Sequence, residues 1–160
     1  YSLKMDLGFN LPVLGITQIP LQTSGAFPSM RIPSIKLHTL KLENISIRGA
    51  DLLLKINVDN PNGWSMMLNN MNYTLTINGS QWLQGTSGDR ITISEHQENM
   101  IDIPFSLNFF DMGTSVYNLL TGDKTLTYSL KGGADLESSI PLVGSFNLPF
   151  DKNGQIDVLK

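Results

Sequence analysis

Apolar and polar residues alternate along most of the chain. In the clearest run, every second residue from Leu52 to Val58 is apolar, with Lys55 and Asn57 among the residues between them. This spacing of two is typical of a β-strand that buries one face and exposes the other. The same alternation recurs in segments 35–47, 71–77, 101–109, 126–130 and 140–150.

Turn residues separate these runs. Asn78-Gly79 supplies the positive φ angles of a tight hairpin, and a change of phase between Leu42 and Ile45 predicts a bulge. Many short strands divided by such turns are typical of an antiparallel β-sandwich. We therefore predict a mainly β fold whose core contains Leu52, Leu54, Ile56, Val58, Tyr73, Leu75 and Phe105.

One segment has a different period. Between residues 111 and 121 the apolar positions are Met112, Val116, Leu119 and Leu120, which lie on one face of a helix. Asp111 is available as its N-cap. The sequence thus predicts one short helix, at about 111–121, on the β architecture.

The first 27 residues resemble the end of the chain. Tyr1-Ser-Leu-Lys4 recurs as Tyr128-Ser-Leu-Lys131. After a two-residue insertion in the later copy, Pro12, Gly15, Pro20 and Gly25 match Pro141, Gly144, Pro149 and Gly154 without a gap. These matches indicate an internal repeat of about 130 residues.

The repeat predicts the domain organisation. Residues 1–27 would be the closing hairpin of a preceding copy, 28–34 a linker with prolines at 28 and 33, and 35–160 a complete domain. The start at Tyr1, with no initiator methionine or apolar signal core, also leads us to expect a longer polypeptide. The alternative is that 1–27 is an integral hairpin of one domain. As an unpaired hairpin, 1–27 could also join a neighbouring molecule and form a strand-exchanged homodimer.

The corner after the strand that ends at Val58 carries a motif. It reads Val58-Asp-Asn-Pro-Asn-Gly-Trp64, followed by an Asn-Tyr-Thr-Leu strand at 72–75 and by Trp82-x-x-Gly85. Together with the Ile103-Pro-Phe105 strand and the terminal Leu148-Pro-Phe150, this pattern resembles the group 2 late embryogenesis abundant (LEA type 2) family. That family carries the water-stress-and-hypersensitive-response (WHy) domain.

The resemblance covers about residues 35–156. With its internal repeat, the chain is similar to bacterial-type members of the family that carry tandem copies. It implies a folded antiparallel β-sandwich of fibronectin type III-like outline, associated with desiccation and stress and without an established catalytic activity. Bacterial relatives are often exported or lipid-anchored, so the resemblance favours an extracytoplasmic location over the cytoplasm.

Two sets of residues are candidate sites. Asn60, Pro61, Asn62 and Gly63 could form a binding loop, but the stronger interpretation is a structural turn in which both asparagines bond the backbone. On that interpretation, replacing either asparagine by alanine costs about 1 kcal/mol of stability. Trp64 and Trp82 are either core residues or aromatic contacts for a sugar or a partner.

Composition and residue spacing argue against several further classes of function. Only 16% of residues are charged and the net charge is −3, which argues against a nucleic-acid surface. There is no cysteine, and His38 and His96 lie far apart with no ligand spacing. No apolar run approaches the length of a membrane span. We predict no enzyme activity, no cofactor and no metal site.

Three functions remain open on these grounds. The first is a stress-associated β-sandwich that acts as a folded protectant or binds a protein or surface partner. The second is an adhesion or carbohydrate-binding module of an exported protein. The third is a spacer domain. Exposed tryptophans beside a groove would favour the second function, and buried tryptophans the first or third.

Overall fold

The chain folds into two compact units, Tyr1–Met30 and Arg31–Lys160. The computed structural model describes residues 2–11, 15–25, 29–113, 115–122 and 125–159. In the first unit, β1 (Ser2–Leu11) and β2 (Gly15–Ser24) pair as an antiparallel hairpin. The second unit carries the other described strands and helices.

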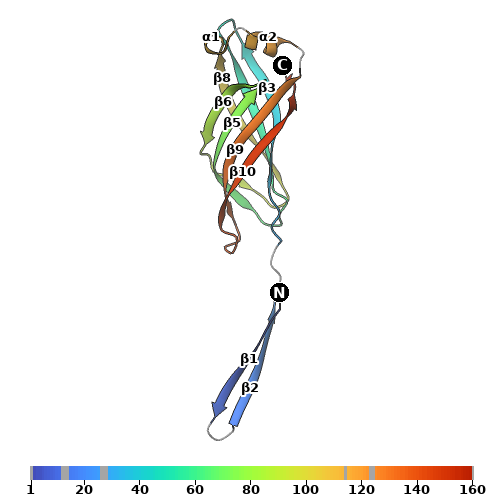
Figure 1. Ribbon diagram of the computed structural model, residues 1–160, viewed down its shortest axis with the longest axis vertical. Coiled ribbons are helices and arrows are strands. Elements are labelled where there is room, and N and C mark those ends of the chain that lie inside the picture. The colour runs from blue at the N-terminus through green and yellow to red at the C-terminus, as the bar shows by residue number, and fades with distance from the viewer. Residues whose placement is uncertain (1, 12–14, 26–28, 114, 123–124, 160) are drawn as a thin grey trace. The chain divides into compact units, whose positions relative to one another are not determined.

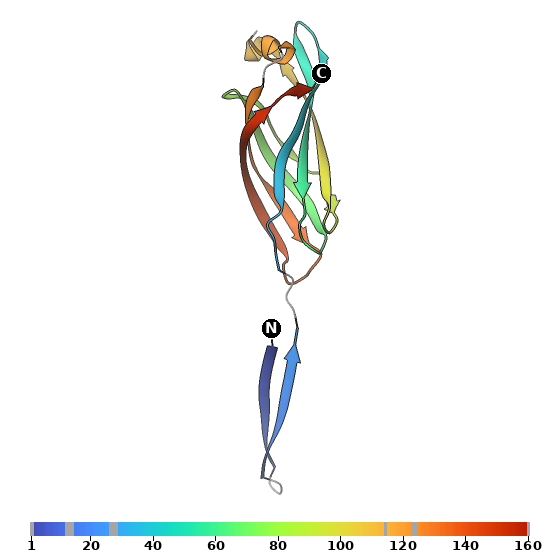
Figure 2. The same ribbon diagram turned by 90° about the vertical axis from the view of Figure 1, so that its right-hand side faces the viewer.

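Two sheets pack face to face in the second unit (Figures 1 and 2). One has the order β10-β9-β5-β6, with β7 also paired to β5, and the other has the order β11-β3-β4-β8. The first sheet consists of β5 (Met66–Ile77), β6 (Ser80–Ser87), β7 (Ile91–Ile93), β9 (Leu126–Ser138) and β10 (Ser145–Ile156). The second consists of β3 (Ser34–Ile45), β4 (Gly49–Asp59), β8 (Glu98–Asn108) and β11 (Val158–Leu159).

The mainly β sandwich expected from the alternation is confirmed, with one departure from antiparallel pairing. The last two-residue strand, β11, pairs with β3 in parallel, Val158 opposite Leu40. The other strand pairs described in the two sheets are antiparallel.

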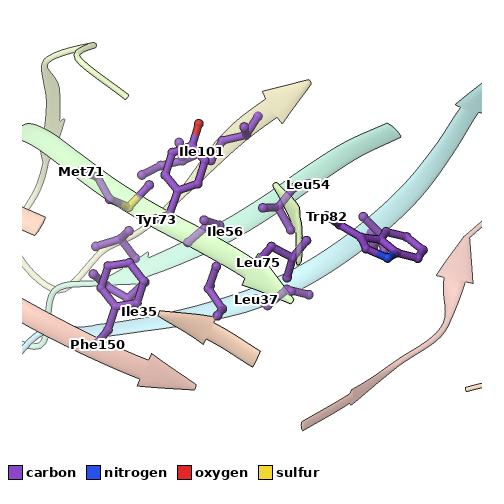
Figure 3. Close-up of a cluster of buried hydrophobic side chains, with 14 of the residues drawn as sticks. Ile35, Leu37, Leu54, Ile56, Met71, Tyr73, Leu75, Trp82, Ile101 and Phe150 are labelled. Atoms are coloured by element: carbon purple, nitrogen blue, oxygen red, sulfur yellow. The ribbon is translucent and has the colours of Figure 1, made fainter. Parts of the chain in front are cut away.

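The core lies between the two sheets (Figure 3). Strand β4 shows how the sequence builds it, because every second residue from Ala50 to Val58 is buried while the residues between them are more exposed. Six of the seven predicted core residues are buried. Phe105 is the exception and is only half-buried. It lies on β8, which is the edge strand of its sheet in the described part of the chain, so its outer side is not covered by another described strand.

The predicted hairpin and bulge are both present. Asn78 and Gly79 adopt φ angles of 46° and 83° between β5 and β6, which is the left-handed pair that a tight hairpin requires. The Asn78 side chain also accepts a hydrogen bond from the backbone N–H of Thr127 at 2.9 Å. The pairing of β3 with β4 shifts register between Leu42 and Asn44.

The predicted single helix is two short helices, α1 (Phe109–Met112) and α2 (Ser115–Thr121). The N-cap is Asn108 rather than Asp111, since the Asn108 side chain accepts a hydrogen bond from the Phe110 N–H at 3.0 Å. Gly113, with φ of 86°, ends α1. The helical period of the apolar residues hides this break, because it runs through both helices. Neither described helix is long and apolar enough to cross a membrane.

The phenol of Tyr73 predicts a pH dependence of stability. Tyr73 is buried on β5, and desolvation raises the pKa of its hydroxyl above the ordinary value. Because the unfolded state then loses this proton first, the contribution of Tyr73 is fully present below about pH 10 and is lost as the pH rises further. We expect the free energy of unfolding to fall above about pH 10, and Tyr73→Phe to reduce that fall. Urea denaturation at a series of alkaline pH values measures this fall in stability. An equal fall in the native chain and in Tyr73→Phe would show that Tyr73 is not its cause.

Candidate functional site

Asn60 opens the loop between β4 and β5, and its side chain is fully buried, with 0% exposure. Its amide nitrogen donates to the carbonyl of Trp64 at 2.8 Å and to that of Ser94 at 3.1 Å. Its side-chain oxygen accepts from the backbone N–H of Asn62 at 3.0 Å. Asn60 therefore supplies partners to three backbone groups, and the bonds to Trp64 and from Asn62 are buried.

Asn62 holds a different part of the chain. Its side-chain oxygen accepts from the backbone N–H of Arg31 at 2.7 Å, and its amide nitrogen donates to the carbonyl of Arg31 at 2.9 Å. One amide side chain thus pairs with both backbone groups of a residue 31 positions away. Asn62 is 1% exposed, whereas Arg31 is exposed, so this part-buried pairing anchors the segment that leads into β3 to the buried loop.

Backbone bonds join the same loop to the turn before β8. The N–H of Asn60 donates to the carbonyl of Gln97 at 3.0 Å, and the N–H of His96 donates to the carbonyl of Asn62 at 3.1 Å. Gly63 is exposed, and Pro61 is half-buried. The motif 60–63 therefore joins three chain segments, and the two asparagine side chains direct most of their polar atoms to the backbone.

The two hydrogen bonds between the Asn62 side chain and the Arg31 backbone, here called the Asn62 clamp, predict a protease-sensitive site. In Asn62→Ala the backbone of Arg31 loses both partners, so the segment around it should open locally more often. We expect trypsin to cleave after Arg31 about tenfold faster, which corresponds to about 1.4 kcal/mol of local opening. Digestion of the native chain, followed by mass spectrometry, measures the rate.

Two comparisons keep this result specific. Cleavage after Arg90, in the loop between β6 and β7, should keep its rate in the variant. Asn44→Ala, which removes an exposed side chain with one long bond of 3.5 Å to Asp51, should not affect Arg31. Equal acceleration at Arg31 and Arg90 would indicate global destabilisation and contradict the local clamp.

The two tryptophans lie inside the sandwich. Trp64 is 5% exposed and Trp82, on β6, is 6% exposed (Figure 3 shows Trp82 among the core side chains). Neither ring is placed to contact a ligand outside the domain. The indole N–H of Trp64 is buried, and none of the described residues accepts a hydrogen bond from it.

Titratable side chains do not converge in the described part of the chain. His38 on β3 and His96 in the turn before β8 are both exposed. No group of three or more histidine, aspartate or glutamate side chains among the described residues is arranged to hold a metal ion. The cross-strand ion pair Lys55–Asp102, at 2.9 Å, is a surface contact.

An apolar surface at the helical end of the domain was not predicted from the sequence. Ile47 is 90% exposed in the β3–β4 turn, Phe110 on α1 is 80% exposed, and Tyr117 on α2 is 42% exposed. Ile47, Phe109 and Tyr117 line a shallow hollow there, and the rings of Phe109 and Tyr117 meet edge to face at 5.9 Å. The consecutive Phe109 and Phe110 at the start of a helix could have indicated this surface in the sequence, because adjacent helical residues cannot both face the core.

Comparisons with known proteins agree with the sequence pattern. Late embryogenesis abundant protein Lea14-A from Gossypium hirsutum is 22% identical over 128 residues, which cover 80% of this chain and 83% of that protein. The desiccation protectant protein Lea14 homolog from Glycine max is also 22% identical and covers 80% of this chain and 82% of its own length. A solution structure from Arabidopsis thaliana shares the fold, with a TM-score of 0.58 at 17% identity over 86% of this chain and 89% of that one.

The family assignment comes from the match across the domain. The model of the late embryogenesis abundant protein family LEA_2 matches residues 55–154, which include the end of β4, the asparagine loop, both helices and most of β10. This range is more than half of the chain. The chain belongs to the late embryogenesis abundant protein family LEA_2.

Proposed function

We propose that this chain is a non-catalytic, desiccation-associated domain that acts as a folded protectant, and that it is one copy within a tandem-repeat protein. The observation that carries the proposal is the family match over residues 55–154. The name of the Glycine max relative, desiccation protectant protein, supports the same role. The internal repeat between residues 1–27 and 128–156 supports the tandem arrangement.

The geometry of the asparagine loop supports a structural role for the family motif. Asn60 and Asn62 use their side chains to hold Trp64, Ser94 and Arg31 in place. A binding loop would need polar groups free to face a ligand. The burial of Trp64 and Trp82 also gives no support to the adhesion or carbohydrate-binding alternative.

A drying assay tests the protectant role. We expect an enzyme that loses activity on drying to retain more activity when it is dried with this chain than with an equal mass of serum albumin. Leu54→Asp, which puts a charge at a fully buried core position and should unfold the domain, is the matched control. Protection no greater than that of albumin would contradict the proposal. Equal protection by the unfolded variant would contradict the requirement for a folded domain.

We also propose that the full protein acts outside the cytoplasm and that residues 35–160 form its complete domain, after a linker at 28–34. The lack of cysteine is compatible with an exported protein, because no thiol is exposed to oxidation. Fractionation of cells that make the full-length protein checks the location.

A further inference from the structure

The hairpin β1–β2 has the same strand register as the hairpin β9–β10. In the sequence repeat, β1 aligns with β9 and β2 aligns with β10. Ser2 pairs with Ser24, and the matching residues Ser129 and Asn153 also pair with each other. Near the other end, Gly8 pairs with Gln18 as Asp135 pairs with Asn147. The two hairpins are therefore equivalent in their backbone pairing as well as in sequence.

The insertion in the later copy also fits this equivalence. β1 and β2 end at the pair Leu11 and Gly15, and the positions of the same strand register in the later copy are Ser138 and Gly144. The two extra residues thus fall in the loop between β9 and β10, where an insertion leaves the register of both strands unchanged. A hairpin unrelated to β9–β10 would have no reason to keep this register.

The two hairpins differ in what covers them. In the second unit, β9 lies between β10 and β5, and Leu130 on β9 pairs with Leu75 on β5, both with 0% exposure. On β1, the matching residue Leu3 is 49% exposed. Leu21, which matches the buried Phe150, is 44% exposed. Among the described residues, β2 is the strand paired with β1, and no strand takes the place of β5.

We propose that β1 and β2 complete the sandwich of an upstream copy of this domain, with that copy's equivalent of β5 paired to the free edge of β1. This inference rests on the tandem arrangement in the proposed function and is independent of the protectant role. An exposed two-stranded hairpin buries little apolar surface by itself. Pairing with an upstream strand would cover Leu3 and Leu21 in the same way that the sheet containing β5 covers Leu130 and Phe150.

One residue distinguishes an upstream copy from a second molecule of this chain. A Cβ at Gly132 would overlap the backbone carbonyl oxygen of Asn72 on β5 and would lie 2.6 Å from the ring of Phe150. By strand register, the β1 residue in the position of Gly132 is Met5, because Met5 pairs with Leu21 as Gly132 pairs with Phe150. If β1–β2 replaced β9–β10 in another molecule, Met5 would place a side chain where β5 leaves no room. This disfavours the strand-exchanged homodimer, whereas an upstream copy can have a β5 that accommodates Met5.

The cross-strand partner of Met5 is smaller than that of Gly132. Gly132 pairs with Phe150, and Met5 pairs with Leu21. A glycine beside a large ring in one hairpin is thus replaced by a longer side chain beside a smaller one in the other. Met5 and Leu21 together are bulkier than Gly132 and Phe150, which is expected if the two hairpins close similar sandwiches with different β5 strands.

An extended chain tests the proposal. A second copy of residues 31–127 is placed directly before Tyr1 of the 160-residue chain, so that β1 and β2 follow it as β9 and β10 follow residue 127. One version keeps the native hairpin, and the other carries Met5→Gly and Leu21→Phe to match Gly132 and Phe150. Hydrogen exchange of the β1 amides is compared with that in the 160-residue chain, and the amides of the original β5 serve as an internal reference.

We expect the β1 amides of the matched version to exchange at least about 100-fold more slowly than in the 160-residue chain, and those of the native-hairpin version to gain much less protection. Unprotected β1 amides in the matched version would overturn the equivalence of the hairpins. Equal protection in both versions would overturn the role of Met5. Sedimentation of the 160-residue chain as a dimer that is lost on removing residues 1–27 would make a second molecule the partner. A failed drying assay would leave all these outcomes unchanged.

Discussion

Asn60→Ala is expected to lower the free energy of unfolding by about 3 kcal/mol, since each buried backbone group left without a partner costs about 1–3 kcal/mol. The substitution removes the donor to the carbonyls of Trp64 and Ser94 and the acceptor for the N–H of Asn62. All of this lies at a side chain with 0% exposure. The structure thus raises the cost above the 1 kcal/mol expected from the motif alone. Urea denaturation with an unchanged m-value measures the loss.

Asn147→Ala is the matched control. Asn147 lies on β10 and donates to Asp135 at 2.7 Å, but it is exposed. Water replaces that bond when the side chain is removed, so we expect a cost below about 1 kcal/mol. Equal costs for Asn60→Ala and Asn147→Ala would show that the buried network contributes no more than a surface hydrogen bond, which would contradict the structural role of Asn60.

The strands and the core could be predicted because they follow from local periodicity. Alternation from Leu52 to Val58 defines the buried face of β4, and Asn78-Gly79 defines the hairpin to β6. The helical spacing of apolar residues between 111 and 121 could not reveal the break at Gly113, because the apolar residues of the two helices continue the same spacing across it. It also could not reveal that β8 is an edge strand, which leaves Phe105 half-covered.

The candidate site could be predicted only in part, because its contacts span long distances in sequence. That Asn60 and Asn62 bond the backbone follows from their residue types, and the bond from Asn60 to Asn62 is local. The partners Arg31 and Ser94, however, lie 31 and 34 positions away. Pairing at that distance depends on how the sheets bring the chain together, and no motif encodes it.

These long-range contacts explain why a conspicuous motif need not mark a ligand site. A β-sandwich must connect its two sheets through loops whose backbone groups are partly buried, and each buried group needs a partner. In this domain the loop from β4 to β5 crosses between the sheets, and Asn60 and Asn62 supply those partners. The motif is therefore best explained by the topology of the fold.

The second large effect is expected at Gly132, on β9, where Gly132→Ala should lower the free energy of unfolding by about 3 kcal/mol. The new Cβ would overlap the carbonyl oxygen of Asn72 and lie 2.6 Å from Phe150. Phe150 could rotate away, but the Asn72 carbonyl is backbone, so β5 and β9 would have to separate. Gly88→Ala is the control, because a Cβ there meets no atom within 4 Å and should change stability by less than about 1 kcal/mol. If thermal and urea denaturation showed equal effects at the two glycines, β9 would tolerate a side chain beside β5, and Met5 would no longer distinguish an upstream copy from a second molecule.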